Sequence, residues 1–144
     1  MQISRTFEVE APLPALRDYL ADFSNAEAWD PGTQKSVRRG VGPVEVGAQW
    51  DNTSKLFGIT TELVYELVQL EDDLVVLRGK NDTAVAEDRI ELVPIGADRT
   101  EVTYQSTITF SGAAKLVDPV AKLGFQKVAD EVEELLQREG AKLS

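Results

Sequence analysis

The chain has 144 residues, with 15 Lys and Arg against 25 Asp and Glu, and it contains neither histidine nor cysteine. Its length suits one domain over 1–144, and its net charge of −10 opposes nucleic acid and anionic membrane surfaces as partners, because both are polyanions. The lack of cysteine excludes disulfides and predicts a cytoplasmic location. The lack of histidine excludes Ser–His and Cys–His nucleophile systems and removes the commonest metal ligand, so we expect no metal or cofactor.

The N-terminal segment has the pattern of one strand followed by helices. Apolar and polar residues alternate over 2–10, as in a half-buried strand. Apolar residues then recur at three- and four-residue steps within 14–24, which predicts an amphipathic helix. A second short helical turn covers 26–29, and Asp30-Pro31-Gly32 closes it. No signal-peptide pattern opens the chain and no apolar run approaches about eighteen residues, so we expect no leader and no membrane insertion.

Six further strand patterns follow, and short polar or Gly-Pro turns separate them. They cover roughly 34–41, 47–55, 59–70, 74–79, 84–92 and 102–110. Short connections between successive strands favour antiparallel hairpins. The segment from Pro94 to Arg99 is expected to form the loop of the last hairpin.

The C-terminal segment has the pattern of one long helix. Asp118 and Pro119 fit the N-cap and the first helical position, and Gly140 fits the end. An apolar stripe at helical spacing consists of Val120, Leu123, Val128, Val132, Leu135 and Leu136. About twenty helical residues span about 30 Å, enough to cross a sheet. The predicted fold is therefore α+β, with an antiparallel sheet of about seven strands wrapped around this helix and two short helices after the first strand.

Six fragments, in a characteristic order and spacing, carry a resemblance to a known family. They are Phe7-Glu8-Val9-Glu10-Ala11-Pro12, Asp22-Phe23 leading to Trp29-Asp30-Pro31-Gly32, Val46-Gly47, Leu63-Val64-Tyr65-Glu66-Leu67, Thr100-Glu101-Val102-Thr103-Tyr104 and Asp118-Pro119. Together they resemble the START-like (SRPBCC) superfamily, in its bacterial polyketide cyclase/dehydrase-like branch. The resemblance covers the entire chain and implies the helix-grip fold.

The resemblance implies a broad range of functions. Its members bind lipids, sterols, polyketides or plant hormones in a cavity between the sheet and the long helix. Some cyclise or aromatise polyketides, and others act as co-chaperones or toxins. The shared motifs mark the fold rather than a reaction, so the resemblance assigns no catalytic residue. Trp29 is either a lid over the cavity mouth or a core residue beneath the small helices, and we favour the core.

The strand phase that turns the apolar residues inward also places polar side chains in the cavity. A buried Asp88 needs a partner, and Arg5 or Arg78 is expected to supply it. Beside Tyr65 and Tyr104, Asp88 is a candidate general acid or base; the alternative is a carboxylate that reaches water or holds a structural salt bridge. The predicted ligand-binding residues are Trp50, Asn52, Leu63, Tyr65, Ala86, Asp88, Tyr104, Ser106 and Leu123.

Three functions remain open at this point. The first is a non-catalytic binder of a small hydrophobic molecule such as a lipid, polyketide or aromatic compound, with Trp50 pointing into the cavity as a fluorescent reporter. The second is an enzyme of the polyketide cyclase/dehydratase type that uses Asp88, Tyr65 and Tyr104. The third is a protein-interaction module of the co-chaperone kind, but evenly alternating strands do not suggest the exposed apolar patch that it needs. A monomer is the default expectation.

Overall fold

The computed structural model describes residues 1–56, 58–111 and 119–143, with all their side chains except those of Leu56 and of 119–123. Its strands are β1 (Gln2–Val9), β2 (Thr33–Arg39), β3 (Gln49–Leu56), β4 (Ile59–Glu71), β5 (Leu74–Lys80), β6 (Ala84–Gly96) and β7 (Arg99–Phe110). Its helices are α1 (Leu13–Ala21), the 3-10 turn η1 (Phe23–Asn25), α2 (Ala26–Trp29) and α3 (Pro119–Ala141). The predicted N-cap, Asp118, lies outside the described residues. In the part of the chain that is described, no helix has the length and hydropathy for crossing a membrane.

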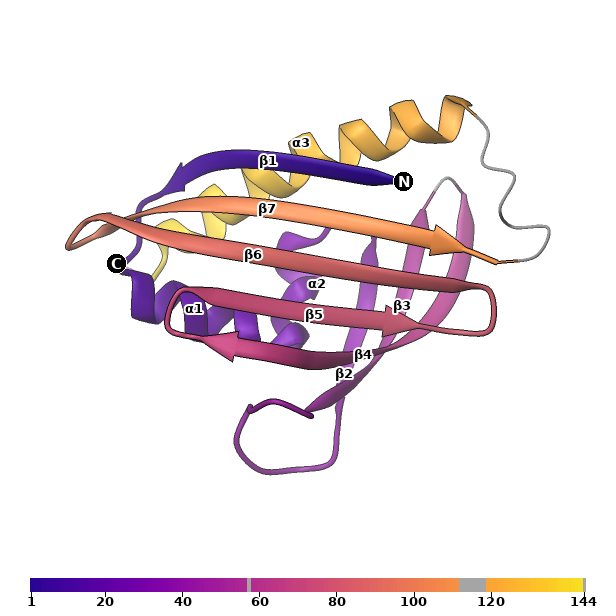
Figure 1. The fold of residues 1–144 in the computed structure, drawn as a ribbon, viewed down its shortest axis with the longest axis horizontal. Helices are drawn as coiled ribbons and strands as arrows, with labels where there is room; N and C mark the ends of the chain where they lie inside the picture. The colour runs from indigo at the N-terminus through magenta and orange to yellow at the C-terminus, as the bar shows by residue number, and fades with distance from the viewer. Residues whose placement is uncertain (57, 112–118, 144) are drawn as a thin grey trace.

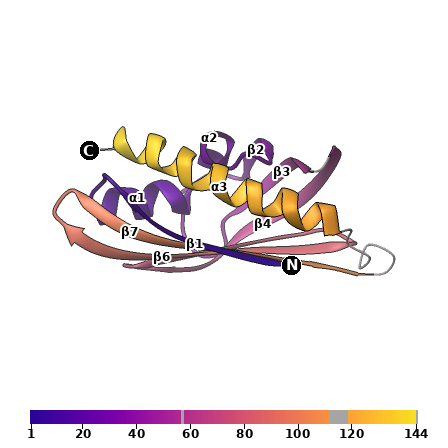
Figure 2. The same cartoon turned by 90° about the horizontal axis from the view of Figure 1, so that it is seen from above.

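The seven strands form one antiparallel sheet in the order β1-β7-β6-β5-β4-β3-β2 (Figure 1). Apart from β1 and β7, all neighbours in the sheet are consecutive in sequence. The consecutive strands β1 and β2 therefore occupy opposite edges, and the segment between them must cross the sheet. That segment forms α1, η1 and α2, which lie on the same face of the sheet as α3 (Figure 2). The predicted α+β fold, a seven-stranded sheet with a long C-terminal helix, is confirmed.

The inner face of the sheet consists of alternate residues from each strand, because successive side chains of a strand point to opposite faces. Cross-strand pairs place Trp50, Tyr65, Gly79, Ala86 and Ile108 in one row across β3 to β7. The register shifts of the sheet lie outside this row, so the predicted alternation holds where the cavity forms.

Two loops, between β6 and β7 and between β2 and β3, differ in length from the sequence-based expectation. Pro94 pairs with Thr100, and β6 continues to Gly96, so most of the expected loop is strand. A register shift after Pro94 accommodates this residue, which has no N–H to donate to the ladder. The connection between β2 and β3 is longer than the expected Gly-Pro turn and spans 40–48.

The C-terminal part of α3 packs directly against β1. Gly140 permits this approach, because a β-carbon at position 140 would collide with Cγ1 of Val9. The helix continues to Ala141, so Gly140 is a contact residue rather than the expected helix end. A second contact between β1 and α3 lies nearer the N-terminal end of the helix, where Arg5 Nε donates to Asp130 Oδ1 at 3.2 Å. Arg5 belongs to β1 and therefore lies at the edge of the sheet.

We predict that Gly140→Ala lowers the free energy of unfolding by about 1–3 kcal/mol, because the added methyl group overlaps Val9. The change is expected despite a gain in helix propensity of up to about 1 kcal/mol. Urea denaturation would measure it. Gly96→Ala is the matched control, since a β-carbon there meets open space. A Gly140→Ala protein at least as stable as the parent would contradict the close packing of α3 on β1.

Candidate functional site

A cavity of about 310 Å³ lies between the inner face of the sheet and α3. Much of its wall is apolar and comes from Leu63, Ala84, Ala86, Ile108 and Phe110 of the sheet and from Phe125 and Val128 of α3. Its polar part includes Asp30, Ser54, Tyr65, Asp88, Tyr104 and Ser106. A mostly apolar wall with a few placed polar groups is typical of a small-molecule site.

Six of the predicted ligand-binding residues border this cavity. They are Leu63, Tyr65, Ala86, Asp88, Tyr104 and Ser106. Trp50 and Asn52 are buried without bordering it. The side chain of Leu123 lies outside the described residues. A role of any of these residues in binding stays a prediction, but the fold brings most of them to one hollow.

Trp50 and Asn52 lie on the inner side of the sheet, but Trp50 packs against the segment that crosses it and Asn52 is bonded to the start of β2. Trp50 Nε1 donates to Ser24 Oγ of η1 at 3.1 Å, and its ring lies edge-on to Phe23. Asn52 Nδ2 donates to Thr33 Oγ1 at 3.1 Å. The expectation that the Trp50 indole points into the cavity is therefore wrong, because η1 covers that part of the inner face.

An aromatic cluster supports the cavity from the side of η1 and α2. Trp29 is fully buried, with its ring centroid 6.1 Å from those of both Phe23 and Tyr104. It is a core residue rather than a lid. Phe23 stacks on Tyr65 with a centroid distance of 4.2 Å, and a β-carbon at Gly79 would collide with the ring of Tyr65. The Tyr65 ring is thus held in one place.

Asp88 is the most buried carboxylate of the sheet and is hydrogen-bonded within the cavity wall. It is 4% exposed. Tyr104 Oη donates to Asp88 Oδ1 at 3.1 Å, and the hydroxyl of Ser106, its cross-strand partner, donates to the same carboxyl group. Two hydroxyl donors from β7 therefore take the place of the cation that was expected.

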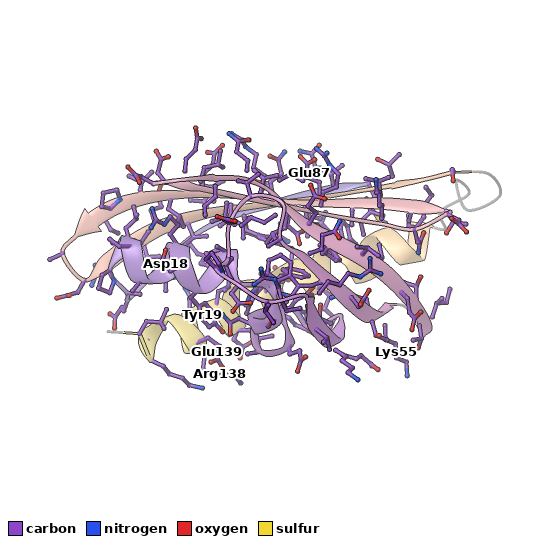
Figure 3. All side chains as sticks on the ribbon, turned by 90° about the horizontal axis from the view of Figure 1, so that it is seen from below. Asp18, Tyr19, Lys55, Glu87, Arg138 and Glu139 are labelled. Atoms are coloured by element: carbon purple, nitrogen blue, oxygen red, sulfur yellow. The ribbon has the colours of Figure 1, made fainter. Side chains whose placement is uncertain are left out.

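Neither arginine proposed from the sequence reaches Asp88. Arg5 is engaged with Asp130 on α3. Arg78 pairs with Glu87 at 2.8 Å, and Glu87 lies on the face of the sheet away from the helices (Figure 3). The strand period explains this correction, because Arg78 aligns with Glu87 in the ladder while Asp88 faces inward.

Asp30 is a second cavity carboxylate that the sequence interpretation treated only as part of a turn. It follows α2, where its two oxygens accept hydrogen bonds from Gly32 N at 3.0 Å and Thr33 Oγ1 at 2.9 Å. Those bonds fix its side chain at the cavity wall. The fragment Trp29-Asp30-Pro31-Gly32 was the available signal, but nothing in the sequence indicates that it approaches Asp88.

The electrostatics of the cavity follow from burial and from the proximity of the two carboxylates. Burial, and then the charge of Asp30, raise the pKa of Asp88 to about 7, although its bonds from Ser106 and Tyr104 oppose the shift. Burial also raises the pKa of Asp30. Burial and the nearby acids raise the pKa values of Tyr65 and Tyr104 well above the usual range, so both stay neutral.

Comparison with protein families identifies the relatives of this fold. The family model described as "Polyketide cyclase / dehydrase and lipid transport" matches residues 1–139. The chain belongs to this family. The search of curated proteins found no match.

Solved structures with the same fold come from several bacteria. A START superfamily protein from Mycobacterium smegmatis has a TM-score of 0.80 and 16% identity, with 99% of each chain covered. The Zhui aromatase/cyclase from Streptomyces sp. R1128 has a TM-score of 0.77 and 14% identity, over 97% of this chain and 93% of that one. A protein from Thermus thermophilus has a TM-score of 0.79 and 11% identity, over 100% and 99%. At identities this low, the three structures show that the fold is shared and nothing beyond it.

We predict that the protein loses stability as the pH rises from about 4 to about 7. An unfolded aspartate titrates near 4, whereas Asp88 keeps its proton up to about 7, so the folded state binds more protons in this interval. The contribution is on the order of a few kcal/mol, complete below about pH 4 and lost above about pH 7.

Urea unfolding at about pH 5 and about pH 8 would measure this contribution. Asp88→Asn should flatten the pH dependence, because the amide does not titrate. Glu87→Gln, which changes the neighbouring carboxylate on the outer face, should keep most of it, because the charge of Glu87 is the smallest of the causes that raise the pKa of Asp88. Parent and Asp88→Asn proteins with the same pH dependence would show that Asp88 is ionised throughout.

Proposed function

We propose that the protein binds a small hydrophobic molecule, such as a lipid, polyketide or aromatic compound, in the cavity between the sheet and α3. The observation that carries the proposal is a hydrogen-bonded polar pair, Asp88 and Tyr104, in the wall of an otherwise mostly apolar hollow of about 310 Å³. Apolar surface holds the body of a ligand, and the few polar groups orient it. The family description, which includes lipid transport, supports the same class of ligand.

The expected affinity follows from the size of the cavity. A ligand that removes about 200–300 Å² of apolar surface from water gains roughly 5–7 kcal/mol at about 25 cal/mol per Å². Association opposes this gain through lost translational and rotational freedom, and polar contacts add to it. If these two effects are similar in size, dissociation constants of about 10–200 µM are expected.

A pair of neighbouring variants tests this function. Ala86 borders the cavity, whereas Val85 is 42% exposed on the opposite face. Ala86→Leu should fill the hollow and weaken binding of the uncharged fluorescent probe N-phenyl-1-naphthylamine by about tenfold or more, while Val85→Leu should bind like the parent. Fluorescence titration would measure both, and mass spectrometry of extracted protein would identify a co-purified ligand. Equal binding by all three proteins would place the probe outside the cavity.

Catalysis of the cyclase or dehydratase type is a second candidate, favoured by the pKa of Asp88 at about 7 next to the Tyr104 hydroxyl. A general acid or base works best when its pKa is close to the operating pH. The Streptomyces structure with this fold is an aromatase/cyclase, which supports testing aromatic polyketides as substrates.

If a polyketide is turned over, Asp88→Asn should lower kcat by about 10²–10⁴, the usual contribution of general acid–base catalysis. Glu87→Gln should leave kcat unchanged, since that carboxylate lies on the outer face (Figure 3). Thermal melting would verify that both variants fold. An undiminished kcat in Asp88→Asn would restrict Asp88 to a binding role.

A further inference from the structure

We infer that the ligand of this cavity is an apolar molecule that carries a protonated amine, which binds at the part of the wall formed by Asp30, Asp88 and Tyr65. The inference rests on the proposed binding function and narrows it to one chemical class. It excludes fatty acids and other carboxylates as the preferred ligands.

The charged groups in the described part of the wall are both acidic, and they stand beside the neutral polar side chains of Ser54, Thr61, Asn81, Thr83 and Ser106. Asp30 and Asp88 both border the cavity, and the charge of Asp30 acts on Asp88. Tyr104 already donates its hydroxyl proton to Asp88, so the remaining capacity of that oxygen is to accept. Among the described residues of the wall there is no lysine or arginine. The two carboxylates therefore lack a cationic partner there.

The Tyr65 hydroxyl is an independent indication of a ligand. Tyr65 borders the cavity and is only 6% exposed, yet its Oη forms no hydrogen bond with any described residue. Phe23 on one face and Gly79 on the other hold its ring, so the hydroxyl is not free to turn toward a partner elsewhere. The hydroxyl therefore opens onto the cavity, where it is available to a molecule that enters. A ligand that donates a hydrogen bond there would gain a partner that the described residues do not supply.

An ammonium group is the chemical complement of this arrangement. It brings a positive charge and three N–H donors, and the wall presents two carboxylates and a phenol oxygen that can accept them. A neutral alcohol brings one donor and no charge, and a carboxylate ligand would meet two like charges. A metal ion is a poorer match, since no third acidic side chain joins these two among the described residues.

The test compares three probes that share one naphthyl ring and differ at the end of a short chain: naphthylethylamine, naphthylethanol and naphthylacetate. Calorimetric titration of the parent protein at about pH 8 should give the amine at least a tenfold tighter dissociation constant than the alcohol, the scale of a hydrogen bond to a charged group. The acetate should bind more weakly than either. This comparison needs no variant, so it does not depend on a substitution being tolerated.

The pH dependence provides a second readout. Asp88 faces Asp30, Tyr65, Tyr104 and Ser106 in the wall, and the part of α3 that borders the cavity contributes Phe125 and Val128. Both tyrosines stay neutral near pH 7, so the carboxyl groups govern the titration. Between about pH 6 and about pH 8 the amine stays protonated while Asp88 loses its proton. Affinity for the amine should rise over this interval, and affinity for the alcohol should not.

Two variants assign the preference to the cavity. Asp88→Asn should bring the amine to within a few-fold of the alcohol while the alcohol still binds, and Glu87→Gln should behave like the parent. An alcohol that binds as tightly as the amine, or an acetate that binds best, would overturn the inference and leave the proposed binding function standing. Failure of all three probes to bind would overturn the inference together with that function.

Discussion

The placement of β1 and β2 at opposite edges of one sheet is the constraint on which the rest of the structure depends. Because the two strands are consecutive, the chain between them has to cross the inner face, and it does so as three short helical pieces. This crossing covers Trp50 with η1 and delivers Asp30 to the cavity wall. The long C-terminal helix then lies beside the crossing, with its end seated against β1. The hollow between sheet and helices is a result of this topology.

The same topology determines how charge is distributed inside the hollow. Successive strand residues point to opposite faces, so Arg78 and Glu87 pair outside while Asp88 is left within. Two hydroxyl donors from β7 stabilise the Asp88 carboxyl group without neutralising it. Since Asp30 arrives from a different part of the chain, its charge adds to the burial of Asp88, and both effects raise the pKa of the latter.

Sequence reasoning predicted local periodicity well and long-range contacts poorly. The alternation of apolar and polar residues correctly predicted that Asp88 and Tyr104 lie on the inner face. This pattern is a strong signal, because a shift of one residue would turn every apolar side chain of a strand toward solvent. The same reasoning offered Arg5 or Arg78 as the partner of Asp88, whereas Arg5 pairs with Asp130 of α3 and Arg78 pairs with Glu87. It also predicted that Trp50 points into the cavity, and it did not identify Asp30 as a residue of the cavity wall. Both depend on where a connecting segment lies over the sheet, and neither periodicity nor turn propensity carries that information.

The polar cavity wall lowers the stability of the protein, and the fixed position of Tyr65 suggests what is gained in return. A buried carboxyl group that titrates near neutral pH lowers stability relative to an apolar wall of the same shape. A fold selected for stability alone could close the hollow with larger side chains, and small residues such as Ala86 show that the sheet leaves it open. Aromatic packing against Phe23 and the absence of a side chain at Gly79 hold the hydroxyl in place before any ligand arrives. Polar groups held in advance lose little freedom on binding, so the stability lost in the empty protein reappears as affinity and selectivity for a ligand that satisfies them.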